Sequence, residues 1–368
     1  MNSFEKVQNM FNLVPPKDRR EIPVYPMILT FAATCAGMTQ KEIIDSPKNW
    51  MKALDLTYQK IGIPDVSPVN YPGDVIFLMG LEFRRPGYEI GVNECYQFIE
   101  KPQFEQSEYK KILETGWNNW YNQYLSRIQV PQIKSNFGII FRWIKVGMNG
   151  GKVTKYLAKK GVAPIHGTGM GPVFDTLSMV RSFEEFIYDL YEVPELIKDV
   201  VMKGTVEVTD LAMTNAKRSK LPRVSMYAMR SDAAVISPDI FKEFSFPALK
   251  YMVETFHKNG IQSVIHADSN WLPMLPSFLE LPKGSIHFEF DGETDIIKAY
   301  DIIGGWHSMR GDVNANMMVF GTPDDVSQYC EKLISTIGMK GGFMLGSGCE
   351  VPLNAKPECV KAMIDAVR

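Results

Sequence analysis

The chain has 368 residues, of which 45% are hydrophobic and 22% are charged, a composition typical of a globular protein with ample material for a large core. Its formal net charge is −2 and it has no basic tract, so nucleic acid is not an expected partner. No segment is apolar for long enough to span a bilayer and the amino terminus lacks a secretory pattern, so we expect a cytoplasmic protein without a membrane partner.

Short apolar runs alternate with longer amphipathic stretches along the chain, which predicts βαβ units around a parallel sheet. The predicted strands are Val24–Leu29, Val66–Val69, Ala163–His166, Val224–Tyr227, Ser263–His266, Ser285–Glu289, His307–Gly311 and Gly342–Leu345. The predicted helices are Gln40–Ile61, Phe183–Ala216, Pro238–Asn259, Thr294–Ile303, Pro323–Ile337 and Pro357–Val367. Because eight strands are the number in a (β/α)8 TIM barrel, we predict this α/β fold as one domain over residues 1–368, with a helical extension at 1–21.

A long interval, about 73–160, separates the second predicted strand from the third, and its length predicts a structured insertion. The interval is rich in aromatic residues, which are Phe77, Phe83, Tyr88, Tyr96, Phe98, Trp117, Trp120, Tyr121 and Tyr124. Two interpretations are open. These rings could line a substrate pocket at the carboxyl-terminal face of the barrel, or they could form the insertion's own small core.

Two predicted strands end in residues that bind metals. His266 and Asp268 end the fifth strand, where alternation places both side chains on one face, and Cys349 follows a glycine-rich turn after the eighth. The five cysteines are odd in number and widely spaced, so reduced thiols are expected. Imidazole, carboxylate and thiolate at one barrel mouth would form a three-ligand zinc site with an open position. The alternative is a hydrogen-bonding histidine and an unrelated buried cysteine.

Further polar residues follow other predicted strands. We expect Glu289 and Asp291 to be catalytic, and His166, Asn270 and Asp312 to bind substrate. The alternative for each is a structural salt bridge or loop cap. The chain has no phosphate-binding Gly-x-x-x-x-Gly-Lys loop, no dinucleotide-binding Gly-x-Gly-x-x-Gly turn and no Gly-x-Ser-x-Gly elbow. Nucleotide hydrolysis, Rossmann-type redox chemistry and serine hydrolysis therefore lose support.

The carboxyl-terminal third resembles the uroporphyrinogen decarboxylase superfamily. The resemblance is carried by the segments HADSNW, FDGETDIIKA, MRGDVNANMMVFGTPDDV, GGFMLGSGCEVP and AKPECVKAM. Its wider pattern covers the chain from about Ile22 to the carboxyl terminus, more loosely in the insertion. It implies a TIM barrel that is either a decarboxylase or a zinc-dependent corrinoid methyltransferase.

Two local features favour the methyltransferase branch. The decarboxylases carry arginines after the first strand, whereas Tyr25–Phe31 contains none. The methyltransferases bind zinc through a His-x-Cys and a later Gly-Cys, which correspond here to His266, Asp268 and Cys349. The middle residue departs from that pattern, because a carboxylate replaces a thiolate. A harder ligand leaves zinc a stronger Lewis acid for an oxygen ligand. The alternative is that Asp268 only orients His266 or caps the following loop.

The resemblance therefore implies a corrinoid-dependent methyltransferase of the O-demethylase type. It would move a methyl group from a methoxylated compound, expected to be aromatic, to the Co(I) corrinoid of a partner protein. Zn²⁺ would be bound, and the partner would supply cob(I)alamin and carry away methylcobalamin. Zinc or an acid such as Glu289 or Asp291 would stabilise the departing oxyanion. A homodimer is one option for its assembly.

Two rival functions remain. A decarboxylase of a small carboxylate could use Arg230 or Arg310 in place of the missing arginine pair. A barrel that binds a ligand without turnover is the other.

Overall fold

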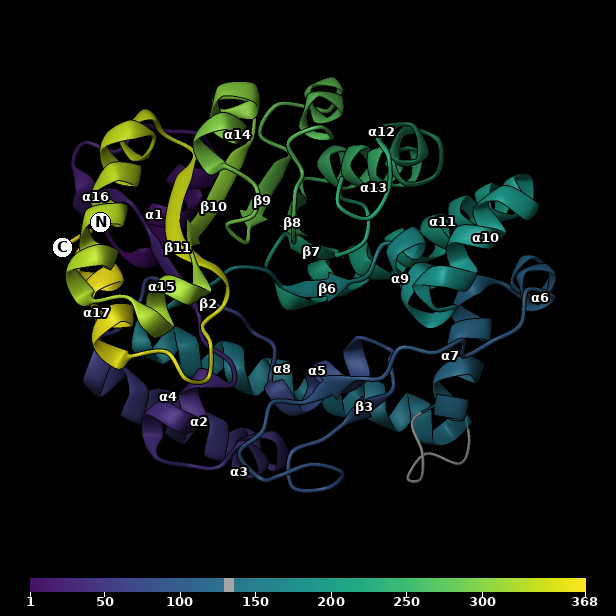
Figure 1. Ribbon diagram of the computed structural model, residues 1–368, viewed down its shortest axis with the longest axis horizontal. Coiled ribbons are helices and arrows are strands. Elements are labelled where there is room, and N and C mark those ends of the chain that lie inside the picture. Colours follow the sequence, from purple (N-terminus) through teal and green to yellow (C-terminus); the bar gives the residue numbers. More distant parts are fainter. Residues whose placement is uncertain (129–135) are drawn as a thin grey trace.

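The main sheet of the protein is parallel and has seven strands. The computed structural model describes residues 1–128 and 136–368. The strand order is β1-β11-β10-β9-β8-β7-β6. The strands are β1 (Val24–Met27), β6 (Thr168–Met170), β7 (Arg223–Ala228), β8 (Gln262–Ala267), β9 (Ile286–Phe290), β10 (Ser308–Val313) and β11 (Phe343–Glu350). The sheet curls into a half-barrel, consistent with the predicted TIM-like barrel (Figure 1).

A short second sheet lies beside the free edge of β1. It pairs β2 (Val66–Ser67) with β5 (Ala163–Pro164) in parallel. The backbone N–H of Asp65 donates to the carbonyl of Val24 at 3.1 Å, which joins β2 to β1. Both strands are shorter than predicted. Pro68 and Pro164 explain this, because proline has no N–H to donate to a ladder.

Three predicted helices are interrupted. Gln40–Ile61 divides into α3 (Gln40–Asp45) and α4 (Pro47–Ile61), and Phe183–Ala216 divides into α10 (Phe183–Glu192) and α11 (Pro194–Ser219). Proline begins the second helix of each pair and disfavours helical geometry in the residue before it. The third, Pro238–Asn259, consists of α12 (Pro238–Ile240), a π-helical segment Phe241–Ser245 and α13 (Phe246–Lys258).

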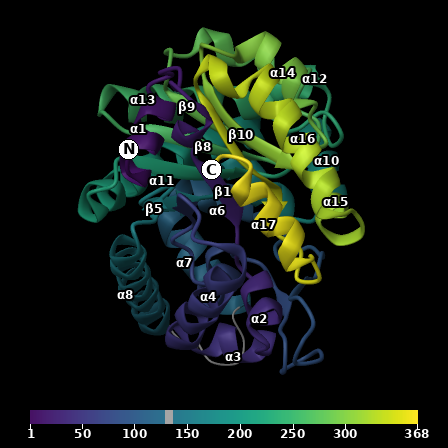
Figure 2. The same ribbon diagram turned by 90° about the vertical axis from the view of Figure 1, so that its left-hand side faces the viewer.

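The other helices cover the outside of the sheet. The predicted helices near the carboxyl terminus are confirmed as α14 (Ile296–Ile303), α16 (Pro323–Thr336) and α17 (Pro357–Asp365). In Figure 2, strands β8, β9 and β10 lie in the upper half of the molecule, with α13 on one side and α14 and α16 on the other. Three further helices are α2 (Phe31–Ala36), α9 (Val173–Val180) and α15 (Ala315–Phe320). Among the described residues, no helix is both long and apolar enough to cross a bilayer.

The amino-terminal extension covers the end of the sheet opposite the strand carboxyl termini. It contains α1 (Ser3–Phe11) and a 3-10 turn at Arg19–Glu21. Phe11 is buried, its ring lies 5.1 Å from that of His287, and the guanidinium of Arg223 lies 5.0 Å from it. The extension therefore closes this end of the sheet with the Phe11 ring, which packs on His287 and Arg223.

The segment between β2 and β5 is mostly helical. It contains α5 (Pro72–Leu78), a hairpin of β3 (Phe83–Arg84) and β4 (Gln97–Phe98), α6 (Glu108–Thr115), α7 (Trp117–Ile128) and α8 (Asn136–Lys160). The α7 aromatics pack on one another, with Trp120 and Tyr124 stacked at 5.4 Å between ring centroids. Both rings are fully buried, which favours the core interpretation for them. That the interval is an insertion stays a prediction.

Phe288 is a test of the interior packing. It lies on β9, is fully buried, and its ring meets that of Phe278 edge-on at 5.0 Å. We expect Phe288→Ala to lower the free energy of unfolding by about 3–5 kcal/mol, because it leaves a cavity that the sheet cannot fill. Phe320→Ala is the control, since that side chain is 78% exposed, and it should change stability by less than about 0.5 kcal/mol. Equal urea midpoints for the two variants would contradict this packing.

Candidate metal centre

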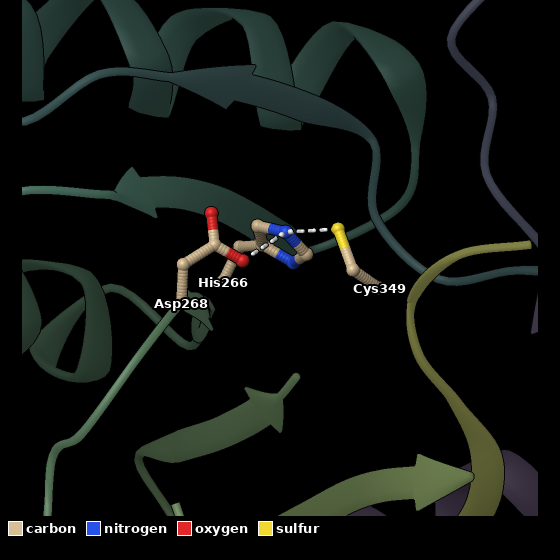
Figure 3. Close-up of side chains that lie close together, drawn as sticks. All are labelled: His266, Asp268 and Cys349. Atoms are coloured by element: carbon tan, nitrogen blue, oxygen red, sulfur yellow. Dashed lines mark hydrogen bonds and ion pairs between the residues drawn. The ribbon is translucent and has the colours of Figure 1, made fainter. Parts of the chain in front are cut away.

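Three side chains from two distant strands converge at the carboxyl ends of the strands. His266 lies near the end of β8, Asp268 follows that strand directly, and Cys349 lies near the end of β11. Two strands, β9 and β10, separate β8 from β11 in the sheet. The curl of the sheet brings the three together, and Figure 3 shows Asp268 and Cys349 on either side of the His266 ring.

The distances within this cluster suit a metal ion. His266 Nε2 lies 3.2 Å from Asp268 Oδ1 and 3.5 Å from Cys349 Sγ. One ligand atom from each residue lies within 4.8 Å of the other two. Ligand atoms around tetrahedral zinc, with bonds of about 2.0–2.3 Å, are separated by about 3.3–3.6 Å. The three residues could therefore hold zinc with little movement and leave a fourth position open.

The opposite nitrogen of His266 is held by a carboxylate. Glu289 on β9 is buried, and its Oε2 lies 3.1 Å from His266 Nδ1. This contact places a proton on Nδ1 and leaves Nε2 free to face Asp268 and Cys349, which is the usual support of a metal-binding histidine. Burial raises the pKa of Glu289, but Arg310 and His266 outweigh it and lower the pKa to about 2. Its position thus suits orientation of His266 better than the donation of a proton.

The electrostatics of the cluster attract a cation. Burial by itself lowers the pKa of His266, but the charges of Asp268 and Cys349 raise it well above its usual value. Positive charge at Nε2, on a proton or on a metal ion, is stabilised there by the Asp268 carboxylate.

Asp291 and Asn270 serve the loops beside the cluster. Asp291 accepts hydrogen bonds from the backbone N–H of Ser269 at 2.6 Å and of Glu293 at 2.9 Å. Asn270 Oδ1 accepts from the backbone N–H of Leu272 at 3.2 Å. These contacts favour the structural alternative, although the predicted catalytic role of Asp291 and the substrate contact of Asn270 stay predictions.

The remaining predicted residues, Asp312 and His166, form no hydrogen bond or ion pair with His266, Asp268 or Cys349 in the part of the chain that the structure describes. Asp312 accepts a hydrogen bond at 2.5 Å from the hydroxyl of Tyr329 on α16, which covers the outside of the sheet. His166 is buried, and burial lowers its pKa to about 4, so its ring is neutral. Their predicted roles in substrate binding stay predictions.

Sequence reasoning missed the central position of Arg310, which it considered only as a carboxylate-binding residue of a decarboxylase. The side chain lies on β10, is fully buried, and places Nε 3.8 Å from Glu289 Oε1. Its Nη2 donates to the carbonyl of Gly348 at 2.9 Å. An arginine inside a strand predicted for the interior of the barrel is the sequence feature that could have indicated this position.

The buried carboxyl of Asp175 predicts a pH dependence of the free energy of unfolding. Asp175 on α9 accepts hydrogen bonds from the Arg230 backbone at 2.8 Å and the Ser231 hydroxyl at 2.9 Å, and burial raises its pKa to about 7. A carboxyl whose pKa is raised on folding stabilises the fold below its unfolded pKa, and this contribution is lost as pH rises through the folded pKa. We therefore expect the wild type to lose stability, relative to Asp175→Asn, between about pH 4 and pH 7.

Urea unfolding of both proteins across this range measures the difference. The two stability curves should diverge as pH rises, because asparagine keeps a hydrogen-bonding amide but does not ionise. Parallel curves would contradict the raised pKa.

The curled parallel sheet, with polar side chains gathered at its strand ends, defines the fold and site of a TIM-like barrel enzyme. Residues 150–368, more than half of the chain, match the family model described as Uroporphyrinogen decarboxylase (URO-D). The chain belongs to this family.

One solved structure similar to the protein is a methyltransferase from Methanosarcina mazei. The TM-score is 0.73 at 17% sequence identity, and the match covers 100% of this chain and 98% of the other. At this identity the likeness shows a shared fold. A search of curated proteins finds no significant match.

Proposed function

We propose that the protein is a zinc-assisted methyltransferase that transfers the methyl group of a methoxylated aromatic compound to the Co(I) corrinoid of a partner protein. The observation that carries this proposal is the convergence of His266, Asp268 and Cys349 at the strand ends. A nitrogen, an oxygen and a sulfur donor with one open position suit a catalytic zinc ion. The methyltransferase fold of the M. mazei structure supports the same reaction class.

The charges around the cluster favour a divalent cation. Asp268, Glu289 and a metal-binding Cys349 thiolate carry three negative charges, and Arg310 carries one positive charge. A divalent ion would neutralise the remaining two. Because unbalanced charge is costly inside a protein, this arrangement fits Zn²⁺ better than a monovalent ion.

Each residue of the cluster has a defined task in this mechanism. His266, Asp268 and Cys349 would hold zinc, which when bound supplies a Lewis acid for the ether oxygen. Glu289 keeps the Nδ1 proton on His266 and so directs its Nε2 toward the site.

The transfer itself needs no nucleophile from this chain. The bond between the ether oxygen and the methyl carbon breaks, and its electron pair stays on oxygen. The Co(I) of the partner supplies the electron pair of the new bond to carbon. A proton from solvent then neutralises the oxyanion.

The hard carboxylate ligand at position 268 favours an oxygen-containing substrate. A carboxylate at position 268 donates less electron density to zinc than a thiolate would, so the ion keeps more affinity for a hard oxygen. A methyl ether therefore suits the site better than a thioether.

Decarboxylation is the second candidate, because the matching family model is named for a decarboxylase. Such a reaction needs a cationic group for the substrate carboxylate. Both candidate arginines have partners, since Arg230 pairs with Glu100 at 2.9 Å and Arg310 lies beside Glu289 at 3.8 Å. These contacts favour the methyltransferase.

The proposal is tested by mixing the purified protein with a Co(I) corrinoid protein and a panel of methoxylated aromatic compounds. Conversion of the Co(I) spectrum to that of methyl-Co(III) is the expected result, and treatment with a chelator should prevent it without unfolding the chain. Release of CO₂ from small carboxylates without corrinoid would instead support decarboxylation. Ligand binding without any turnover would indicate a non-catalytic barrel.

A further inference from the structure

Arg310 lies on β10, between the two strands β9 and β11. Glu289 comes from β9, and Cys349, the metal ligand at the far side of the cluster, comes from β11. The guanidinium is fully buried and lies 4.8 Å from the centre of the Tyr25 ring. A buried arginine with a planar fork can hold two groups in fixed directions.

The first contact of Arg310 is with Glu289, the carboxylate that lies beside His266. Arg310 Nε lies 3.8 Å from Glu289 Oε1, and the other oxygen of that carboxylate lies 3.1 Å from His266 Nδ1. The carboxylate therefore stands between the guanidinium and the imidazole. Arg310 Nε and Glu289 Oε1 form an ion pair without a hydrogen bond, so the guanidinium acts on this carboxylate, and through it on His266, by charge.

The second contact of Arg310 is with the backbone directly before Cys349. Arg310 Nη2 donates to the carbonyl of Gly348, the residue before Cys349, at 2.9 Å. This part of β11 packs so closely that a Cβ at Gly348 would lie 2.0 Å from the carbonyl oxygen of Asp291. The backbone that presents the thiol thus has little freedom, and Arg310 holds its carbonyl.

We propose that Arg310 is a positioning residue that fixes the imidazole of His266 and the thiol of Cys349 relative to each other. One guanidinium supports both ligands, each through a single intermediate group. This inference rests on the metal-binding part of the proposed function and is independent of the identity of the methyl donor.

The test compares Arg310→Lys with the wild type. Lysine keeps the positive charge but has no planar fork, so it cannot hold Glu289 and the Gly348 carbonyl in their present directions. We expect zinc affinity, measured by competition with a chromophoric chelator, to fall about 10–100-fold, as for other residues that support metal ligands. The visible spectrum of the Co²⁺-substituted protein should also change, because it reports ligand geometry.

The control is Arg223→Lys. Arg223 is also buried in the sheet and donates to the backbone carbonyls of Ile165 and Pro164 at 2.6 and 2.9 Å. Its replacement should lower thermal stability while zinc affinity and the Co²⁺ spectrum stay unchanged. Equal losses of zinc affinity in both variants would overturn the proposal, since a general loss of stability would then explain them.

A double-mutant cycle with Glu289→Gln gives a second measurement. If Arg310 acts partly through Glu289, Arg310→Lys should weaken zinc binding less in the Glu289→Gln protein than in the wild type. Additive losses would overturn this part of the mechanism. Should Arg310→Lys fail to fold, Arg310→Gln takes its place in the cycle, with circular dichroism as the check of folding.

The test of the positioning role of Arg310 can be distinguished from the test of the proposed methyl transfer. Wild-type zinc affinity and Co²⁺ spectra are measured without methyl donor or corrinoid. Tight zinc binding that depends on Arg310, in a protein without methyl transfer, would support the positioning role and overturn the proposed reaction. Wild-type zinc affinity in the Arg310→Lys protein would overturn the positioning role alone.

Discussion

The Cys349→Ala protein is expected to contain almost no zinc and to lose more than about 100-fold of its methyl-transfer rate, beyond the 10–100-fold typical of residues that only support a ligand. The chain supplies three ligands, so the loss of the thiolate leaves His266 and Asp268 alone. Two protein ligands are fewer than catalytic zinc sites use. Zinc content per chain, measured by atomic emission after dialysis, gives the answer.

The matched control is Cys330→Ala. Cys330 is buried in α16 on the outside of the sheet, so its replacement should leave the zinc content at that of the wild type. Far-ultraviolet circular dichroism should be unchanged in both variants, because a catalytic metal is not the main support of the fold. Full zinc occupancy in a His266→Ala/Cys349→Ala protein would exclude the cluster as the metal site.

The part of the site that the sequence predicts follows from local rules. His266 and Asp268 lie two residues apart at the end of an apolar strand, and alternation places them on one face. Parallel strands end on the same side of the sheet, which brings the β11 residue Cys349 to that edge. In the structure His266 Nε2 and Cys349 Sγ lie 3.5 Å apart, and their role as metal ligands stays a prediction.

The contacts of Glu289 and Arg310 could not be predicted in the same way. Alternation indicates which face of a strand a residue occupies, but not which neighbour its side chain reaches. Those contacts depend on the curl of the sheet and on rotamers across three strands. Asp312 shows the limit of the rule, because it lies two residues from the inward Arg310 and yet contacts Tyr329 of α16.

The predictions of single helices over Gln40–Ile61 and Phe183–Ala216 were wrong for a local reason that the sequence contains. Pro47 and Pro194 each lie inside an amphipathic pattern that predicts one helix. The residues before them, Ser46 and Val193, have φ values of −144° and −135°, which are not helical. Hydrophobic periodicity continues across such a break, since both helices still face the core, so periodicity alone conceals it.

Asp268→Cys is expected to change the substrate preference of the site. The variant has two thiolates and one imidazole around the ion, so zinc should bind more tightly and accept less electron density from an ether oxygen. We expect the rate of ether demethylation to fall about tenfold or more, the scale of loss that accompanies a change in the surroundings of a metal. Methyl transfer from the methylated corrinoid protein to a small thiol should rise, and both rates follow from the cobalt spectrum.

Asp268→Asn is the control that separates ligand from loop cap. Asparagine keeps the size of the side chain but loses its charge, so a metal ligand at this position should become weaker and zinc affinity should fall. The Asp268 side chain contacts His266 at 3.2 Å, whereas the carbonyl of the same residue accepts from Trp271 Nε1 at 2.8 Å. The backbone contact survives the substitution, so the loop should keep its shape. Unchanged zinc affinity in Asp268→Asn would show that the carboxylate only orients His266, and the preference for an oxygen-containing substrate would then lose its physical basis.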